Sequence, residues 1–100
     1  MVFNNTKYVT NGINNRVPKD LQQLLWKLVD TMKVTNKDYM QLFKVETINE
    51  FGIYKLIIRH SQEEPNYVKE HMLLTTSKLN ENIYVIDDGP HSTMLLAEEY

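Results

Sequence analysis

The side chains best suited to acid–base or metal chemistry in this sequence are three histidines, His60, His71 and His91. Imidazole titrates near neutral pH and is a common ligand of zinc. A polar stretch with one proline follows His60 and predicts a turn that closes a hairpin with His60 opposite Tyr67. In that register His71 lies opposite Leu56, about 13 Å along the strand from His60, too far for two ligands of one ion. We therefore predict no metal site and no catalytic histidine.

A second group with chemical potential surrounds the Gly-Pro dipeptide near the end of the chain. Asp87 and Asp88 precede the dipeptide, and His91 and Ser92 follow it. Neighbouring strand residues point to opposite faces, so the two carboxylates would not converge as an acid–base pair. Ser, His and Asp are the residue types of a hydrolase triad, but adjacency supplies neither convergence nor an oxyanion hole. A small hydrolase with its site at this turn is the alternative interpretation, and we favour a protein that is not an enzyme.

The composition excludes several other classes of function. The chain has no cysteine, so disulfides, thiolate zinc sites and cysteine nucleophiles are excluded. Glycine-rich phosphate loops, the HExxH helix and the EF-hand loop are all missing, which predicts no cofactor. The net charge of −2 and the pI of about 5.9 argue against nucleic acid as a partner. No apolar run approaches the ~20 residues that span a bilayer and the start does not resemble a signal peptide, so we expect a cytoplasmic protein without membrane contact.

Charge is distributed unevenly along the chain. Residues 1–62 contain nine Lys or Arg and five Asp or Glu, whereas residues 63–100 contain two and eight. Basic and acidic strands lying side by side in one sheet would neutralise each other, and this is the interpretation we favour. A dipolar surface that steers a partner, or a second copy of the chain, is the alternative.

The first part of the sequence predicts a strand and then a helix. Residues 7–13 are rich in β-forming side chains, and Asn11 and Gly12 indicate a turn or bulge, so we expect a strand leading into a loop. Pro18 and Asp20 are typical of a helix start, and Lys33 suits its end. Apolar residues recur between them at steps of three and four and predict a helix of about four turns. This apolar stripe consists of Leu21, Leu24, Leu25, Leu28 and Met32.

The remaining sequence predicts strands. Residues 38–48 and 52–60 are rich in aromatic and β-branched side chains and indicate an antiparallel hairpin. Residues 66–74 and 82–88 predict a third and a fourth strand, and residues 92–100 a terminal helical turn or strand. A helix with one apolar stripe needs an apolar sheet face to cover it. We therefore predict one α+β domain over residues 1–100, a two-layer sandwich with one main helix packed on a mainly antiparallel sheet of about five strands.

One tryptophan lies outside the apolar stripe of the predicted helix. At 100° per residue, Trp26 is roughly 120° from the centre of the stripe, so we expect it to be partly exposed. Tryptophan is enriched in binding hot spots, but we slightly favour the alternative, in which a terminal strand or residues 94–96 fold over it. We predict a non-catalytic protein-binding or adaptor protein whose partner is another protein or a second copy, forming a homodimer. Its predicted binding residues are Trp26, Val29, Met94, Leu95 and Tyr100.

Three segments of the chain resemble a known family. They are VPKDLQQLLWKLVD at 17–30, HSQEEPNYVKE at 60–70 and IYVIDDGPHSTMLLAEEY at 83–100. Together they are similar to short proteins of Gram-positive bacteria and their phages, the domain-of-unknown-function family number 960. Residues 1–13 and 39–54 match more loosely. The resemblance implies a small cytosolic protein and transfers no catalytic residue.

Overall fold

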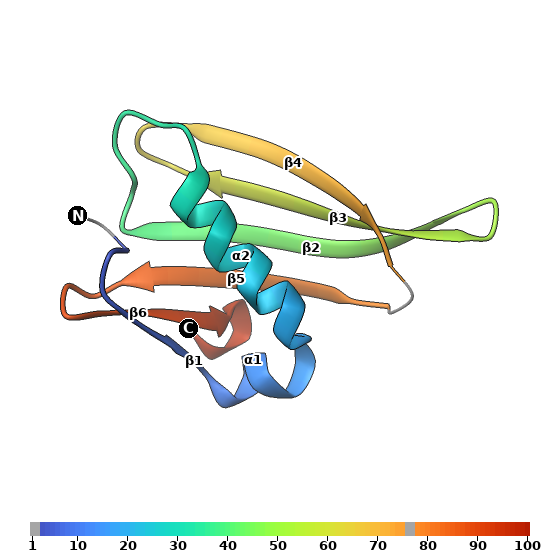
Figure 1. Ribbon diagram of the computed structural model, residues 1–100, viewed down its shortest axis with the longest axis horizontal. Coiled ribbons are helices and arrows are strands. Elements are labelled where there is room, and N and C mark those ends of the chain that lie inside the picture. The colour runs from blue at the N-terminus through green and yellow to red at the C-terminus, as the bar shows by residue number, and fades with distance from the viewer. Residues whose placement is uncertain (1–2, 76–77) are drawn as a thin grey trace.

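The chain forms six strands, two α-helices and a final 3₁₀ turn in the computed structural model, which describes residues 3–75 and 78–100 (Figure 1). In chain order these elements are β1 (Thr6–Val9), α1 (Asn11–Arg16), α2 (Lys19–Thr31), β2 (Met40–Glu50), β3 (Ile53–Gln62), β4 (Tyr67–Leu74), β5 (Asn80–Asp87), β6 (His91–Leu96) and the 3₁₀ turn η1 (Ala97–Glu99). No helix among the described residues is long and apolar enough to cross a bilayer.

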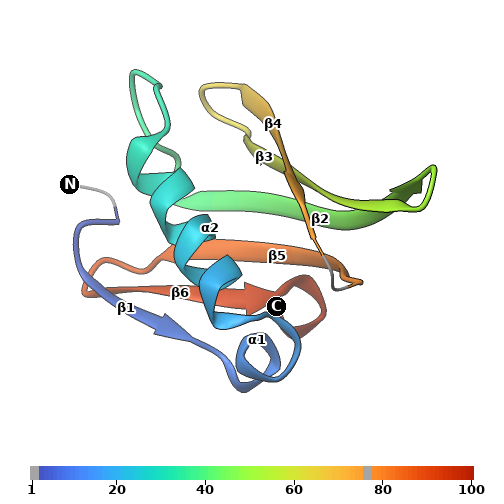
Figure 2. The same ribbon diagram turned by 45° about the vertical axis from the view of Figure 1, so that its right-hand side comes forward.

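All six strands join one sheet in the order β1-β6-β5-β2-β3-β4. β1 pairs with β6 in parallel, and every other neighbouring pair is antiparallel. α2 crosses one face of the sheet, and α1 lies beside β6 near the edge (Figures 1 and 2). The predicted α+β class is confirmed. The sheet has six strands rather than about five, and α1 is a second helix that we did not predict.

The strands predicted after the helix are all present. β2 and β3 form the expected hairpin, and β4 and β5 are the expected third and fourth strands. The final segment, predicted as either a strand or a helical turn, contains both, because β6 leads directly into η1. β6 lies between β1 and β5, so the two ends of the chain meet in the same sheet.

The prediction for residues 7–13 was right for the strand but wrong for the loop after it. Asn11 and Gly12 lie in α1 and not in a turn or bulge. The hydroxyl of Thr10 caps this helix by accepting a hydrogen bond from the backbone N–H of Ile13, whose side chain is fully buried. A Cβ at Gly12 would lie 2.7 Å from the carboxylate of Glu99, so the flexible end of that exposed side chain would have to shift to admit it. A short helix fixed by one cap and one buried side chain has no periodic signal in the sequence.

α2 begins directly after Pro18, as predicted, and its apolar stripe packs on the core. Pro18 is the N-cap and Asp20 lies in the first turn, where a carboxylate stabilises the positive end of the helix dipole. Leu21 and Leu25 of the stripe are buried, and so is Val29, which lies next to it on the helix surface. The helix ends at Thr31, slightly before the Lys33 that we expected.

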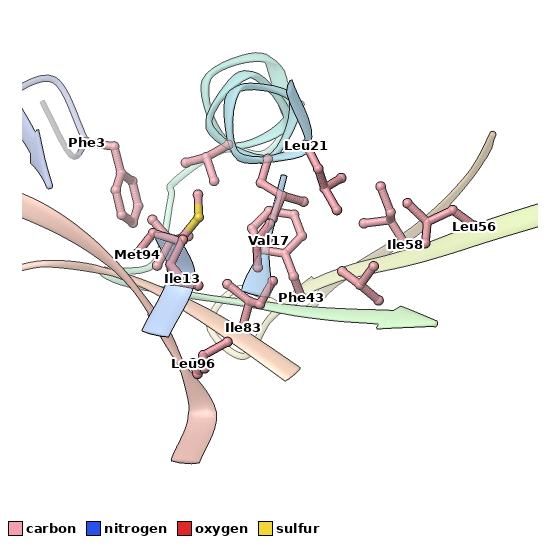
Figure 3. Close-up of a cluster of buried hydrophobic side chains, with 14 residues drawn as sticks. Phe3, Ile13, Val17, Leu21, Phe43, Leu56, Ile58, Ile83, Met94 and Leu96 are labelled. Carbon is pink, nitrogen blue, oxygen red and sulfur yellow. The ribbon is translucent and has the colours of Figure 1, made fainter. Parts of the chain in front are cut away.

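The hydrophobic core lies between α2 and alternate residues of the central strands (Figure 3). Side chains alternate between the two faces of a strand, so only every second residue can reach the helix. From the central strands these buried residues are Phe43, Val45, Leu56, Ile58, Ile83 and Val85. β6 adds Met94 and Leu96, and the N-terminal segment adds Phe3.

The basic and acidic halves of the chain meet at one ion-pair cluster. The guanidinium of Arg16 lies 2.6 Å from a carboxylate oxygen of Glu98 and 3.6 Å from one of Glu81. These contacts join α1, from the basic half, to η1 and β5, from the acidic half. Ion pairs formed by an exposed guanidinium are weak because water and salt screen them, so these contacts neutralise charge more than they stabilise the fold.

Replacing a leucine in the buried stripe of α2 will destabilise the protein. Leu25 is fully buried, and Leu25→Ala removes its packing and leaves a cavity, so the free energy of unfolding should fall by about 3 kcal/mol. Urea denaturation followed by circular dichroism measures this change. Lys27→Ala, on the exposed side of the same helix, is the matched control and should change it by less than about 0.5 kcal/mol. Equal losses in both variants would contradict the packing described here.

Candidate functional site

The carboxylate of Asp87 fastens the N-terminal segment to the end of β5. It accepts hydrogen bonds from the backbone N–H of Phe3 at 2.7 Å, the side-chain amide of Asn5 at 3.1 Å and the backbone N–H of Gly89 at 2.7 Å. The Phe3 N–H contributes most to holding the pKa of Asp87 below its usual value, with smaller effects from Gly89 and Asn5. This carboxylate is occupied by structural bonds on every side.

The other residues of the predicted hydrolase turn do not converge. His91 Nε2 lies 3.0 Å from a carboxylate oxygen of Asp88 at the surface. Ser92 follows His91 in β6 and therefore points to the opposite face, where it is fully buried. Its hydroxyl donates to the side-chain oxygen of Asn5 at 2.6 Å. The histidine thus has a carboxylate partner but no accessible nucleophile beside it.

The register predicted for the β3–β4 pair was wrong by two residues, so the predicted distance between His60 and His71 was too long. β3 continues to Gln62, so the connection is shorter than expected and His60 pairs with Lys69 rather than Tyr67. His71 pairs with Ile58, which places the two histidines diagonally on one face, about 7–8 Å apart by strand geometry. Even so, no three His, Cys, Asp or Glu side chains gather as metal ligands in residues 3–75 and 78–100.

His60 belongs to a buried chain of side-chain amides at one end of the core. The amide nitrogen of Gln62 donates to the backbone carbonyls of Asn36 and Pro65, so its oxygen is the acceptor for Gln41 at 2.7 Å. Gln41 uses its own nitrogen in that bond, which leaves its oxygen facing His60 Nε2 at 2.7 Å. His60 must therefore carry its proton on Nε2, with an unprotonated Nδ1.

Burial controls the ionisation of His60. Its ring is fully buried and stacks on Phe43 with centroids 4.3 Å apart. Loss of hydration lowers the pKa of His60 to about 4, with a smaller contribution from the charge of His71. Burial and the nearby Lys69 also lower the pKa of His71. His60 is therefore a neutral core residue at physiological pH, as the structural interpretation of the sequence expected.

The five predicted binding residues are divided between the two sides of the sheet. Val29 and Met94 are fully buried in the core, because each lies on the face between helix and sheet, and neither side chain reaches the surface. Trp26 is partly buried at the margin of the core, with the ammonium of Lys7 5.6 Å from its ring centroid. Leu95 and Tyr100 lie on the opposite side of the sheet, and they remain candidates for a surface contact.

The face of the sheet turned away from α2, here called the open face, carries most of the exposed hydrophobic side chains. Register places five of the eight exposed large hydrophobic residues of the described chain on this face. Between 51% and 74% of each remains accessible to water. They are Tyr8, Ile53, Val68, Met72 and Leu74. Tyr100 joins them through an edge-to-face contact with Tyr84, with centroids 5.5 Å apart.

A shallow hollow with a cationic lining lies near the centre of the open face. Its volume is about 230 Å³. Lys44 and Arg59 lie directly opposite each other on β2 and β3, and neither takes part in an ion pair among the described residues. On its other side, Arg59 lies opposite Glu70 of β4, which shares the open face. The other side chains of the lining are uncharged and include Leu42, Ser61, Asn82, Tyr84 and Ala97.

The open face was not predicted from the sequence. A strand with one face in water alternates apolar and polar residues, and Leu42, Ile57 and Met72 break that alternation at outward positions. Apolar side chains at these three outward positions were the sign of an exposed apolar face in the sequence. They did not reveal it because a continuous apolar run is also typical of a strand buried on both faces.

Comparison with known proteins places the chain among proteins of unknown function. The model of a staphylococcal family of unknown function, DUF960, matches residues 6–99. A crystal structure of a protein of unknown function from Enterococcus faecalis superimposes with a TM-score of 0.71 and 24% sequence identity. The alignment covers 96% of this chain and 91% of the enterococcal one, and it shows a shared fold. No curated protein matches the chain.

Acidification will destabilise the protein through His60. An ordinary histidine titrates near 6.5, so between pH 6.5 and about 4 the unfolded chain holds a proton that native His60 does not. The free energy of unfolding should therefore fall with decreasing pH in this window, by about 3 kcal/mol in total from His60. Urea denaturation at pH 7 and pH 4.5 measures the loss, and NMR titration of the His60 ring reads its pKa directly.

Two variants separate this effect from general acid sensitivity. His60→Phe removes the main titrating group and should reduce the pH dependence to the smaller share of His71, whereas His91→Asn, at the surface, should leave most of it in place. A His60 pKa near 6.5 in the NMR titration would show that the ring is hydrated and would contradict the buried network.

Proposed function

We propose that this chain, which belongs to the DUF960 family of staphylococcal proteins of unknown function, is a non-catalytic protein-binding protein that acts through its open face. The observation that supports this proposal is the accumulation of exposed hydrophobic side chains on that face. Four of the five residues lie on the neighbouring strands β3 and β4, and clustered exposed apolar side chains are typical of interaction surfaces.

The hollow at the centre of this face indicates the chemistry of the partner. Lys44 and Arg59 lie opposite each other on β2 and β3, with Glu70 opposite Arg59 on β4, and neither cation forms an ion pair among the described residues. A carboxylate from a partner could accept bidentate hydrogen bonds from the guanidinium. The proposed partner therefore presents an acidic side chain surrounded by apolar ones, which contact the exposed residues around the hollow.

The hydrolase alternative has less support from the geometry. Its serine is buried and bonded to Asn5, and its first aspartate is saturated by hydrogen bonds from the N-terminal segment. A nucleophile needs a base within reach and an open path for the substrate. The open face needs no rearrangement to receive a partner, which is why we favour binding.

Site-directed photo-crosslinking tests the proposal. A benzophenone amino acid replaces Met72 on the open face, and the protein is irradiated in host lysate. We expect an adduct of discrete mass at this position. Combining the crosslinker with Arg59→Glu should reduce its yield at least tenfold, because the reversed charge repels the acidic partner.

The matched control places the same crosslinker at Lys27, which is exposed on the outer surface of α2. This position should give no discrete adduct. Equal labelling at both positions, or an adduct at Met72 that persists unchanged with Arg59→Glu, would contradict the proposed surface.

A further inference from the structure

An aromatic side chain occupies an unfavourable conformation at the tip of the β2–β3 hairpin. Glu50 pairs with Ile53, so the turn contains two residues, Phe51 at φ 54° and Gly52 at φ 82°. Positive φ at both positions defines a type I′ turn, which favours Asn, Asp or Gly at the first of them. Phe51 adopts the left-handed conformation with 101% of its surface exposed, so its ring gains no burial within the chain.

The tip extends beyond the rest of the sheet (Figures 1 and 2). β5 pairs with β2 only as far as Glu46, and β4 pairs with β3 only from Lys55 onward. The last residues of the hairpin therefore form a two-stranded ribbon that ends in Phe51. Bonds within the turn hold it in shape, since Asn49 accepts from the backbone N–H of Gly52 at 3.0 Å. A strained, fixed and exposed aromatic ring is typical of a functional contact rather than of folding.

An apolar groove of about 400 Å³ lies in the same half of the molecule, between the start of α2, the start of β3 and the end of β4. Its apolar lining comes from Pro18, Leu21, Leu24, Leu56, Leu73, Leu74 and Leu79. This volume is large enough for one phenyl ring. Leu56 follows Phe51 by five residues along β3, or about 16 Å, too far for the ring to enter the groove of its own rigid hairpin.

We propose that two copies of the chain form a dimer in which Phe51 of each inserts into the apolar groove of the other. A two-fold axis between the copies would place each ring at the groove of the other. Each copy then gives and receives the same side chain, which is the reciprocal pattern of a closed symmetric interface. The dimer also provides the burial that Phe51 lacks in the isolated chain.

The charges at this interface distinguish it from the open face. Asp20 is the one charged side chain in the groove lining, and Phe51 is uncharged. Hydrophobic association of this kind should change little with salt, whereas binding of an acidic partner at Lys44 and Arg59 should weaken as salt screens the charges. The dimer does not depend on the proposed function, and either can fail without the other.

Sedimentation velocity of the full chain across concentration and salt tests the proposal. We expect a monomer–dimer equilibrium that is nearly independent of salt. Phe51→Asn should raise the dimer dissociation constant at least tenfold, because the ring is lost. The same substitution should raise the melting temperature of the dilute monomer by about 5 °C, because asparagine tolerates the left-handed conformation. Tyr39→Asn removes another exposed aromatic residue and should change neither property.

A second variant tests the groove and the reciprocity of the exchange. Leu24→Gln makes the groove polar and should also prevent dimerisation, with circular dichroism confirming that it folds. Mixing Phe51→Asn with Leu24→Gln should restore partial association, because one ring and one groove remain intact. A wild-type monomer at all concentrations would overturn the proposal. Unchanged dimerisation of Phe51→Asn, or open-ended polymers in place of a dimer, would do so as well.

Discussion

One long helix cannot cover both faces of a six-stranded sheet, and this constraint determines the arrangement of the whole molecule. The thirteen residues of α2 extend about 20 Å, enough to cover the central strands on one face in a single crossing. Every strand must therefore turn its apolar positions toward α2 in a consistent register. The fully buried positions Val45, Ile58 and Val85 meet this requirement on three neighbouring strands.

The core changes from apolar to polar along the length of α2. Beneath most of α2 it is hydrocarbon, but toward β4 it ends in His60, Gln41 and Gln62, all buried and linked by hydrogen bonds. Buried amides are tolerated only when their polar atoms find partners, and here they bind backbone carbonyls of the connections that follow α2 and β3. The network thus joins two loops to the end of the sheet, which hydrophobic contacts alone would leave unconstrained.

Local signals in the sequence predicted most of the elements, and contacts distant in sequence account for the errors. Pro18, Asp20 and the leucine stripe marked α2 because capping and periodicity depend on neighbouring residues only. The helix α1 was missed because Ile13 is helical only when the rest of the core buries it. The end of β3 was placed too early because Gln62, a polar residue typical of a turn, is buried and bonded within the fold.

The candidate surface was only partly predictable for a related reason. Tyr100 and Leu95 were expected near a contact surface because the terminal segment is apolar, and the structure places both on the open face. Met94 was included from the same reasoning and Val29 as a neighbour of Trp26, but helical and strand periodicity turn both into the core. Sequence patterns identify which residues are apolar, and only the assembled sheet decides which of them face water.

The two proposed interfaces lie on different parts of the molecule, which has a consequence for binding strength. Contacts through Phe51 and the α2 groove leave the centre of the open face, around Lys44 and Arg59, outside the symmetric interface. A dimer built in this way would present two open faces on one particle. Two linked sites bind a partner with two matching sites, or a clustered partner, far more tightly than either site alone, because the second contact forms at a high effective concentration. Weak, solvent-exposed charge contacts at each of the two hollows would then be sufficient for stable association with such a partner.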